Sequence, residues 1–165
     1  MDIQRIVRHL FAPYWRLGRT FPRETLLAIE EAIRASESMH AGEIRFVVEG
    51  TLDSTSLLKG QTASERAIDV FSLLRIWDTE NNNGLLIYVL LADRAVEIVA
   101  DRGIHAKVGA QVWEKICREM EDAFRAANYA DGVVNGVRAV TQQLSKHFPM
   151  QDPRRNELPN KPVLM

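Results

Sequence analysis

The sequence predicts an α/β fold, a three-layer α/β/α sandwich in which a small mixed β-sheet carries helices on both faces. Runs with the apolar spacing of helices alternate with short runs typical of strands. Residues 85–92 are almost wholly apolar, as in a central strand that is covered on both sides. Only Asp93 and Arg94 separate this run from the next strand-like run, so the two strands should form an antiparallel hairpin.

The composition is that of one folded, soluble domain. The chain has 165 residues, of which 46% are hydrophobic and 26% are charged, so it can bury a core. Its single cysteine, Cys117, excludes an internal disulfide, and no apolar run approaches the ~20 residues that span a bilayer. The net charge of −1 gives no overall field that would attract nucleic acid. We therefore expect a cytoplasmic protein without a nucleic-acid partner.

Residues 1–21 are predicted to form a basic N-terminal arm. Apolar residues recur there at the spacing of one helical face, and Pro13 should end the helix. The residues expected to make contacts are Arg5, Arg8, Phe11, Tyr14, Trp15 and Arg16. Two interpretations stay open. The arm binds a partner protein or an anionic membrane surface, at the inner face of the membrane, or its helix packs back onto the domain.

Residues 22–148 should form the domain, which begins with a helix and a strand. Proline is favoured in the first turn of a helix, so Pro22 marks its start, and Ala41 and Gly42 mark its end. Residues 43–49 alternate in polarity and are rich in β-branched and aromatic residues, which predicts a strand.

A loop and a second helix should follow this strand. Residues 51–61 hold turn-forming side chains and predict a loop. Thr62 and Glu65 have the spacing of a capping box, so a helix should begin there. Its buried face should carry Ala67, Ile68, Phe71 and Leu74.

The second half of the domain predicts a hairpin and two long helices. The crossover helix makes the first two strands parallel, whereas residues 85–92 and 95–100 pair as the antiparallel hairpin. Apolar spacing predicts a helix through Trp113 and Phe124 and another from near Asp131. Residues 149–165 lack periodicity and should form a disordered tail. The expected core comprises Ile44, Phe46, Val48, Leu86, Tyr88, Leu90, Val96, Ile98, Trp113, Ile116, Phe124, Val137 and Leu144.

The loop before the hairpin carries candidate metal ligands. Asp78, Glu80 and Asn82 offer oxygen donors at alternate positions, which can turn toward one hard cation such as Ca²⁺ or Mg²⁺. A hairpin brings the start of its first strand and the end of its second together, so Asp101 and His105 can join these donors.

Two simpler interpretations of these residues stay open. The loop is rich in turn formers and needs no ligand to explain it, and Asp101 can equally cap the following helix or pair with Arg102. His105 has no nearby cysteine or second histidine with which to form a typical zinc site. Any cation site predicted here is therefore a weak one.

The hairpin and its flanks resemble the TPM domain family, which is named for thylakoid lumen, photosystem repair and receptor modulator proteins. The resemblance runs in register from about Pro22 to Phe148 and suggests a soluble bacterial member. It rests on Gly42-Glu43-Ile44, Asn82-Asn83-Gly84, the apolar run after it, Asp93-Arg94, Val96-Glu97-Ile98, Gly103-Ile104 and Asn128-Tyr129. The residues that match the family by identity are Asn83, Gly84, Asp93, Arg94 and Gly103.

The resemblance implies a three-layer α/β/α fold and two kinds of function. Plant members are divalent-metal-dependent acid phosphatases, and others resemble binding or assembly factors beside membrane complexes. This chain departs from the family pattern, because Asn82 replaces the usual aspartate and His105 replaces the usual glutamate. We therefore expect a non-catalytic accessory protein with an unknown protein partner, which assists a membrane-associated complex. The alternative is a metal-dependent phosphatase.

Overall fold

The computed structural model describes residues 3–11, 15–150 and 156–165, so Tyr14 lies outside the described residues. The elements are α1 (Ile3–Phe11), α2 (Trp15–Thr20), α3 (Arg23–Ser36), β1 (Glu43–Glu49), α4 (Ser54–Leu58), α5 (Ala63–Leu73), β2 (Gly84–Leu90), β3 (Ala95–Ala100), α6 (Arg102–Val108), α7 (Ala110–Arg125), α8 (Tyr129–His147) and β4 (Val163–Leu164). Among these residues, no helix is long and apolar enough to cross a membrane.

The strands form one mixed sheet in the order β3-β2-β1-β4. β1 runs parallel to β2, with Glu43 opposite Gly84, and the crossover between them contains α4 and α5. β2 and β3 are antiparallel, with Leu85 opposite Ala100. The predicted pairing of the three main strands is therefore confirmed.

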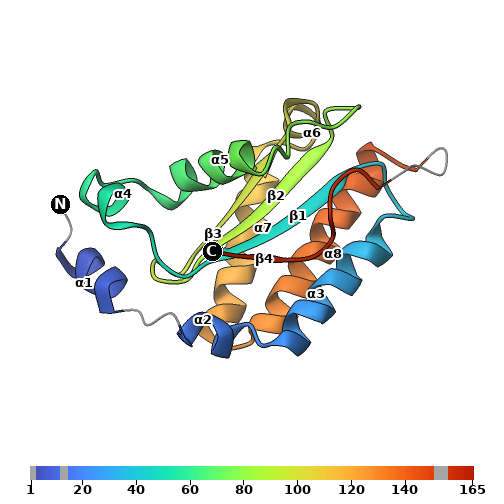
Figure 1. Cartoon of the computed structure of the whole chain (residues 1–165). Helices are drawn as coiled ribbons and strands as arrows, with labels where there is room; N and C mark the ends of the chain where they lie inside the picture. The colour runs from blue at the N-terminus through green and yellow to red at the C-terminus, as the bar shows by residue number, and fades with distance from the viewer. Residues whose placement is uncertain (1–2, 12–14, 151–155) are drawn as a thin grey trace.

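Helices cover both faces of this sheet, as the sequence predicts (Figure 1). α3, α7 and α8 pack on one face around Phe46, Ile87 and Val89. α5 lies on the other face, over Leu86 and Tyr88. All the predicted core residues are buried except Ile98, which is half-buried against the main core.

Two expectations for the β1–β2 crossover are wrong. Residues 51–61 are not wholly a loop, because Asp53 caps the short helix α4 by accepting the N–H groups of Thr55 and Ser56. Ile68 is exposed on α5, where Ala67, Val70 and Phe71 form the buried face instead. The side of α5 that faces the sheet therefore differs from the predicted one. The capping box of Thr62 and Glu65 is present as predicted.

The expectation of a disordered C-terminal tail is also wrong for its described part. Val163 and Leu164 form β4, a parallel partner of β1. The backbone N–H groups of Glu157 and Leu158 donate to the carboxylate of Glu43 at 3.4 and 3.3 Å. Arg45 donates to the carbonyls of Pro159 and Lys161. Two buried charges of β1 therefore hold the tail, although it lacks any periodic pattern of its own.

The boundary expected at residue 22 does not separate an arm from the domain. Leu17 on α2 and Phe21 just after it are almost fully buried in the main core. The Phe21 ring lies 5.9 Å from that of Phe46 and 5.8 Å from that of Tyr129, measured between centroids. The segment that begins with α2 is thus part of the packed body.

A second buried carboxylate of β1 binds α5. Glu49 accepts two hydrogen bonds from Arg66, at 2.9 and 2.8 Å, and one from the Tyr88 hydroxyl at 2.5 Å. Burial and the neighbouring carboxylate both raise the pKa of Tyr88, so the phenol stays protonated and donates. This network fixes α5 against the sheet because a buried charge is costly without its partners.

We predict that Arg66→Ala lowers the free energy of unfolding by about 3 kcal/mol, because it leaves the Glu49 carboxylate buried without its cation. Urea denaturation measures the change. The matched control is Arg34→Ala, which removes an exposed arginine that also contacts two carboxylates and should cost less than about 1 kcal/mol. Equal losses in the two variants would contradict the role given to the buried network.

Candidate functional site

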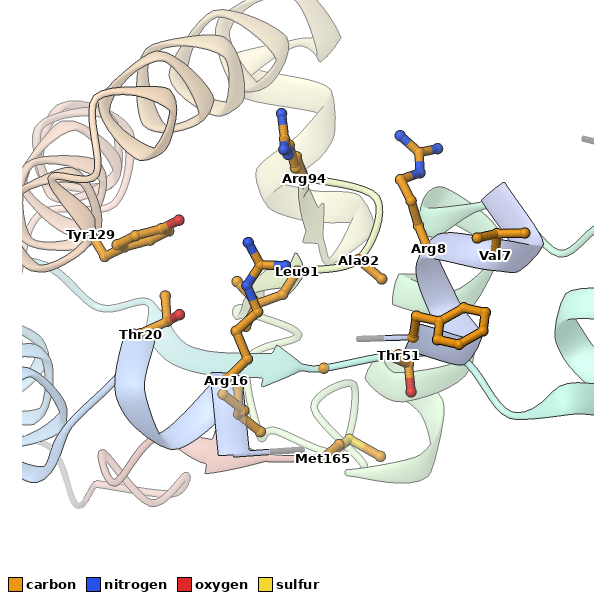
Figure 2. Close-up of a pocket in the computed structure, with 13 residues that line it drawn as sticks. Val7, Arg8, Arg16, Thr20, Thr51, Leu91, Ala92, Arg94, Tyr129 and Met165 are labelled. Atoms are coloured by element: carbon orange, nitrogen blue, oxygen red, sulfur yellow. The ribbon is translucent and has the colours of Figure 1, made fainter. Parts of the chain in front are cut away.

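A cavity of about 460 Å³ opens where the carboxyl ends of β1 and β2 meet α1 and α2 (Figure 2). Its lining comes from α1, α2, the residues after β1, the turn after β2, the start of α8 and the C-terminal residue Met165. In open α/β sheets, ligands bind in the crevice outside the carboxyl ends of parallel strands. The cavity therefore lies where this class of fold places its binding sites.

Among the described residues that line the cavity, three are arginines and none is an aspartate or a glutamate. Arg8 comes from α1, Arg16 from α2 and Arg94 from the turn between β2 and β3 (Figure 2). All three are exposed, and within the described ranges none of them forms an ion pair. Because like charges converge there, the cavity has a positive potential that favours an anion.

The turn after β2 carries two charged residues, Asp93 and Arg94, whose side chains have different roles. Arg94 has a φ of 55°, in the left-handed region that side chains rarely adopt, and its N–H donates to the carbonyl of Leu91 at 3.1 Å. Asp93, one residue earlier, has its carboxylate against α1. The tight turn thus presents Arg94 to the cavity while Asp93 holds the helix beside it.

Asp93 anchors α1 through polar contacts. The Arg5 guanidinium donates to its carboxylate at 2.7 Å, and His9 Nε2 lies 3.0 Å from Oδ1. The backbone N–H of Leu52 donates to His9 Nδ1 at 3.1 Å, so the ring proton must be on Nε2 and points at Asp93. Burial acts to raise the pKa of Asp93, but the hydrogen bonds from Arg5 and His9 and the charge of Arg5 outweigh it and hold the pKa below its usual value.

This docking turns the polar side of α1 inward and its apolar side outward. His9 is 4% exposed, whereas Ile3, Leu10 and Phe11 are 70%, 65% and 78% exposed. The helix therefore does pack on the domain, which was one of the two open interpretations, but with the face opposite to the apolar one. Ile3, Leu10 and Phe11 of its apolar side are therefore exposed.

The cavity also has an apolar part and several hydroxyl groups. Leu17 and Leu91 lie on its inner side, and Val7 and Phe11 of α1 also line it. Thr20, Thr51 and Tyr129 add hydroxyls; in Figure 2 those of Thr20 and Tyr129 point in the direction of Arg16. The site can accept a ligand that combines an anionic group with apolar atoms.

The predicted metal ligands lie at the other end of the hairpin. Asp101 N–H donates to the Gly84 carbonyl at 2.9 Å, so the two segments are neighbours. Asp78 pairs with Arg75 at 2.5 Å, and Oδ1 of Asp101 accepts the N–H of Arg102 at the start of α6, whereas Oδ2 of Asp101 is buried without a hydrogen-bond partner among the described residues. In the described part of the chain, no three His, Cys, Asp or Glu side chains gather as a metal site. Cation binding there stays a prediction.

The remaining predicted residues of this region lie in different surroundings. Glu80 donates its backbone N–H to Glu157 at 2.9 Å, and Asn82 has a φ of 49°. The side-chain amide of Asn83 donates to the carbonyl of Ala41. His105 is exposed on α6.

Two glycines that match the family lie in the same region but under different constraints. A Cβ at Gly84 would lie 2.0 Å from the carbonyl oxygen of Ile76, so no other residue fits there. A Cβ at Gly103 would lie 3.8 Å from the carbonyl oxygen of Asn82, which is an ordinary contact. Only Gly84 is therefore required by the packing around it.

Four residues of the cavity are predicted site residues, but no pattern in the sequence indicates that they lie together. Arg8, Phe11 and Arg16 were expected in an arm, and Arg94 in a turn. Thr20, Thr51, Leu91 and Tyr129 were missed. The signal that could have found Thr51 and Leu91 is the predicted parallel pairing of two strands, because their carboxyl ends meet at one edge.

We predict that Asp93→Asn loosens α1, which should appear as faster amide exchange in residues 3–11 and a lower free energy of unfolding at neutral pH. Because the native pKa of Asp93 is lowered, its stabilising contribution is present above the unfolded pKa of about 3.9 and is lost as the pH falls through the native value. The difference between wild type and variant should therefore shrink in acid. The control is Asp78→Asn at an exposed pair; a pH-independent difference would contradict the prediction.

Comparison with known proteins places this geometry in a family. The model of the TPM domain matches residues 16–143. The NMR structure of the BA42 protein from the psychrophilic bacterium Bizionia argentinensis is 32% identical, with a TM-score of 0.75 over 86% of this chain and 93% of that one. The N-terminal domain of a P. gingivalis protein shares the fold, with 23% identity and a TM-score of 0.63 over 79% and 82%. The search of curated proteins gave no match. The chain belongs to the TPM domain family.

Proposed function

We propose that this TPM domain is a non-catalytic binding protein that assists a membrane-associated complex, and that α1 is the surface through which it reaches an anionic membrane. The observation that carries the proposal is the orientation of α1. Arg5 and His9 bind the helix to Asp93 from its polar side, so its apolar residues face away from the domain.

The exposed face of α1 has the chemistry of an interfacial helix. Such helices bury large apolar side chains at the headgroup boundary and carry basic residues beside them. Ile3, Leu10 and Phe11 are the apolar side chains here, and each contributes about 1.5–3 kcal/mol when it is fully buried. Arg8 lies on the same helix, and a basic residue near an anionic surface contributes about 1 kcal/mol. These terms together support reversible binding to an anionic bilayer.

Three of the carboxylates in and near the hairpin have at least one oxygen in another contact, which supports a binding role. Asp93 is held by Arg5 and His9, Asp78 by Arg75, and Asp101 caps α6. Hard cations prefer free anionic oxygens, and binding one here would require these contacts to be exchanged. A general base likewise needs a carboxylate that is free to take a proton.

Vesicle co-sedimentation tests the membrane contact. The protein should sediment with anionic vesicles and stay in solution with neutral ones, because both the apolar face and the arginines contribute. The double variant Leu10→Ser/Phe11→Ser should reduce binding at least about tenfold. The matched control is Ile68→Ser/Leu73→Ser, which removes two exposed apolar residues of α5 and should bind as the wild type does. Equal binding to both lipids, or none to either, would contradict the proposal.

A phosphomonoester assay with Ca²⁺ or Mg²⁺ tests the absence of catalysis. We expect no turnover above the metal-only background. Metal-dependent turnover that is lost in Asp101→Asn would instead favour the phosphatase. This variant keeps an oxygen that can cap α6, so its loss of activity would not come from the loss of the cap.

A further inference from the structure

We infer that the arginine-lined cavity binds the phosphodiester headgroup of a single anionic glycerophospholipid, whose acyl chains leave along the apolar face of α1. This inference rests on the proposed function, since it identifies the lipid that the domain binds at a membrane surface. The two sites are distinct in the structure. One is the outer face of α1, with Ile3 and Leu10, and the other is the open cavity between that helix, α2 and the sheet; Val7 and Phe11 lie where the two meet.

The charge of the cavity selects an anion. Arg8, Arg16 and Arg94 surround the space, and each guanidinium offers several N–H donors in a planar fork that suits phosphate oxygens. The nearest acidic side chain on the turn, Asp93, is neutralised by Arg5 and contacts His9. The arginines therefore face the cavity without an internal carboxylate to satisfy them in the described part of the chain.

The hydroxyl groups extend this recognition beyond a bare phosphate. Thr20, Thr51 and Tyr129 line the same space and can donate to phosphate oxygens or accept from headgroup hydroxyls. The volume of about 460 Å³ lies within the range of sites that hold small organic ligands, and it exceeds what an inorganic ion fills. The cavity thus fits an anion that carries further atoms.

The apolar lining indicates where the ligand atoms beyond the phosphate extend out of the cavity. Val7 and Phe11 belong both to the cavity wall and to the exposed apolar face of α1. Leu17 and Leu91 continue the apolar surface inward. A ligand whose phosphate binds the arginines has a continuous apolar route from the cavity to the helix face. A phospholipid has both parts, whereas free phosphate or an acidic peptide uses only the charged one.

Amide chemical shifts of the ¹⁵N-labelled full chain test the inference with a monomeric lipid. Dihexanoyl phosphatidylglycerol, kept below its micelle concentration, should shift residues 16–20, 50–51 and 91–94. Dihexanoyl phosphatidylcholine has the same chains but no net charge, and inorganic phosphate has the charge but no chains. Both should bind at least about tenfold more weakly, since each lacks one of the two interactions.

Variants separate a built site from general attraction of charges. Arg16→Gln and Arg94→Gln should each weaken binding of the anionic lipid at least about tenfold, because each removes a charge-assisted hydrogen bond. Arg118→Gln makes the same change of net charge at an exposed position on α7 outside the cavity and should leave affinity unchanged. Thr20→Phe keeps every charge but fills the space, so it should also abolish binding.

Four results would overturn the inference. Loss of affinity equal in Arg16→Gln and Arg118→Gln would mean that the protein attracts anions through its charge alone. Tight binding that survives Thr20→Phe would place the lipid elsewhere. A soluble oligoglutamate peptide that binds the cavity more tightly than the lipid would assign the site to an acidic protein segment. Vesicle binding with no shifts in the cavity would contradict this inference and leave the proposed function standing. Cavity binding of the monomeric lipid without vesicle binding would contradict the proposed membrane contact and leave the lipid site standing.

Discussion

The buried charges of β1 are the constraint on which most of the structure depends. The strand is buried on both faces, yet every second residue on one face except Val47 is charged: Glu43, Arg45 and Glu49. A charge taken out of water needs a partner with good geometry, or it costs several kcal/mol. The chain supplies these partners from three segments that are distant in sequence. The C-terminal tail satisfies Glu43 and Arg45, α5 supplies Arg66, and β2 supplies Tyr88.

The same constraint positions the cavity. Because the tail follows β1 as β4, its last residue reaches the carboxyl end of the strand, where Gly50 N–H donates to the Met165 carbonyl at 3.0 Å. The fixed turn after β2 then presents Asp93 to α1 and Arg94 to the open space. Three parts of the cavity wall, namely α1, the turn after β2 and Met165, are thus held by polar contacts. The strand, the tail and α1 all contribute to one site although they lie far apart in the chain.

The patterns that predicted the fold are local, and the contacts that they missed are not. The apolar run of β2, the capping box at Thr62 and the short link at Asp93-Arg94 each lie within a few residues, and each was read correctly from the sequence. The tail was expected to be disordered because its own composition gives no signal; its order comes from Glu43 and Arg45, more than a hundred residues away. Local patterns likewise do not predict the orientation of α1, since it depends on Asp93, which is distant in the sequence. The hydrophobic spacing of that helix alone favours burying the apolar face, whereas the structure buries His9.

The short strand β4 also protects the protein against aggregation in concentrated solution. The N–H and C=O groups along an uncovered strand are a template on which another chain can add a strand. β4 and the carbonyls that Arg45 binds cover that edge with the chain's own backbone. A chain that lost its last residues to proteolysis would therefore expose the unpaired edge of β1, and we expect it to aggregate.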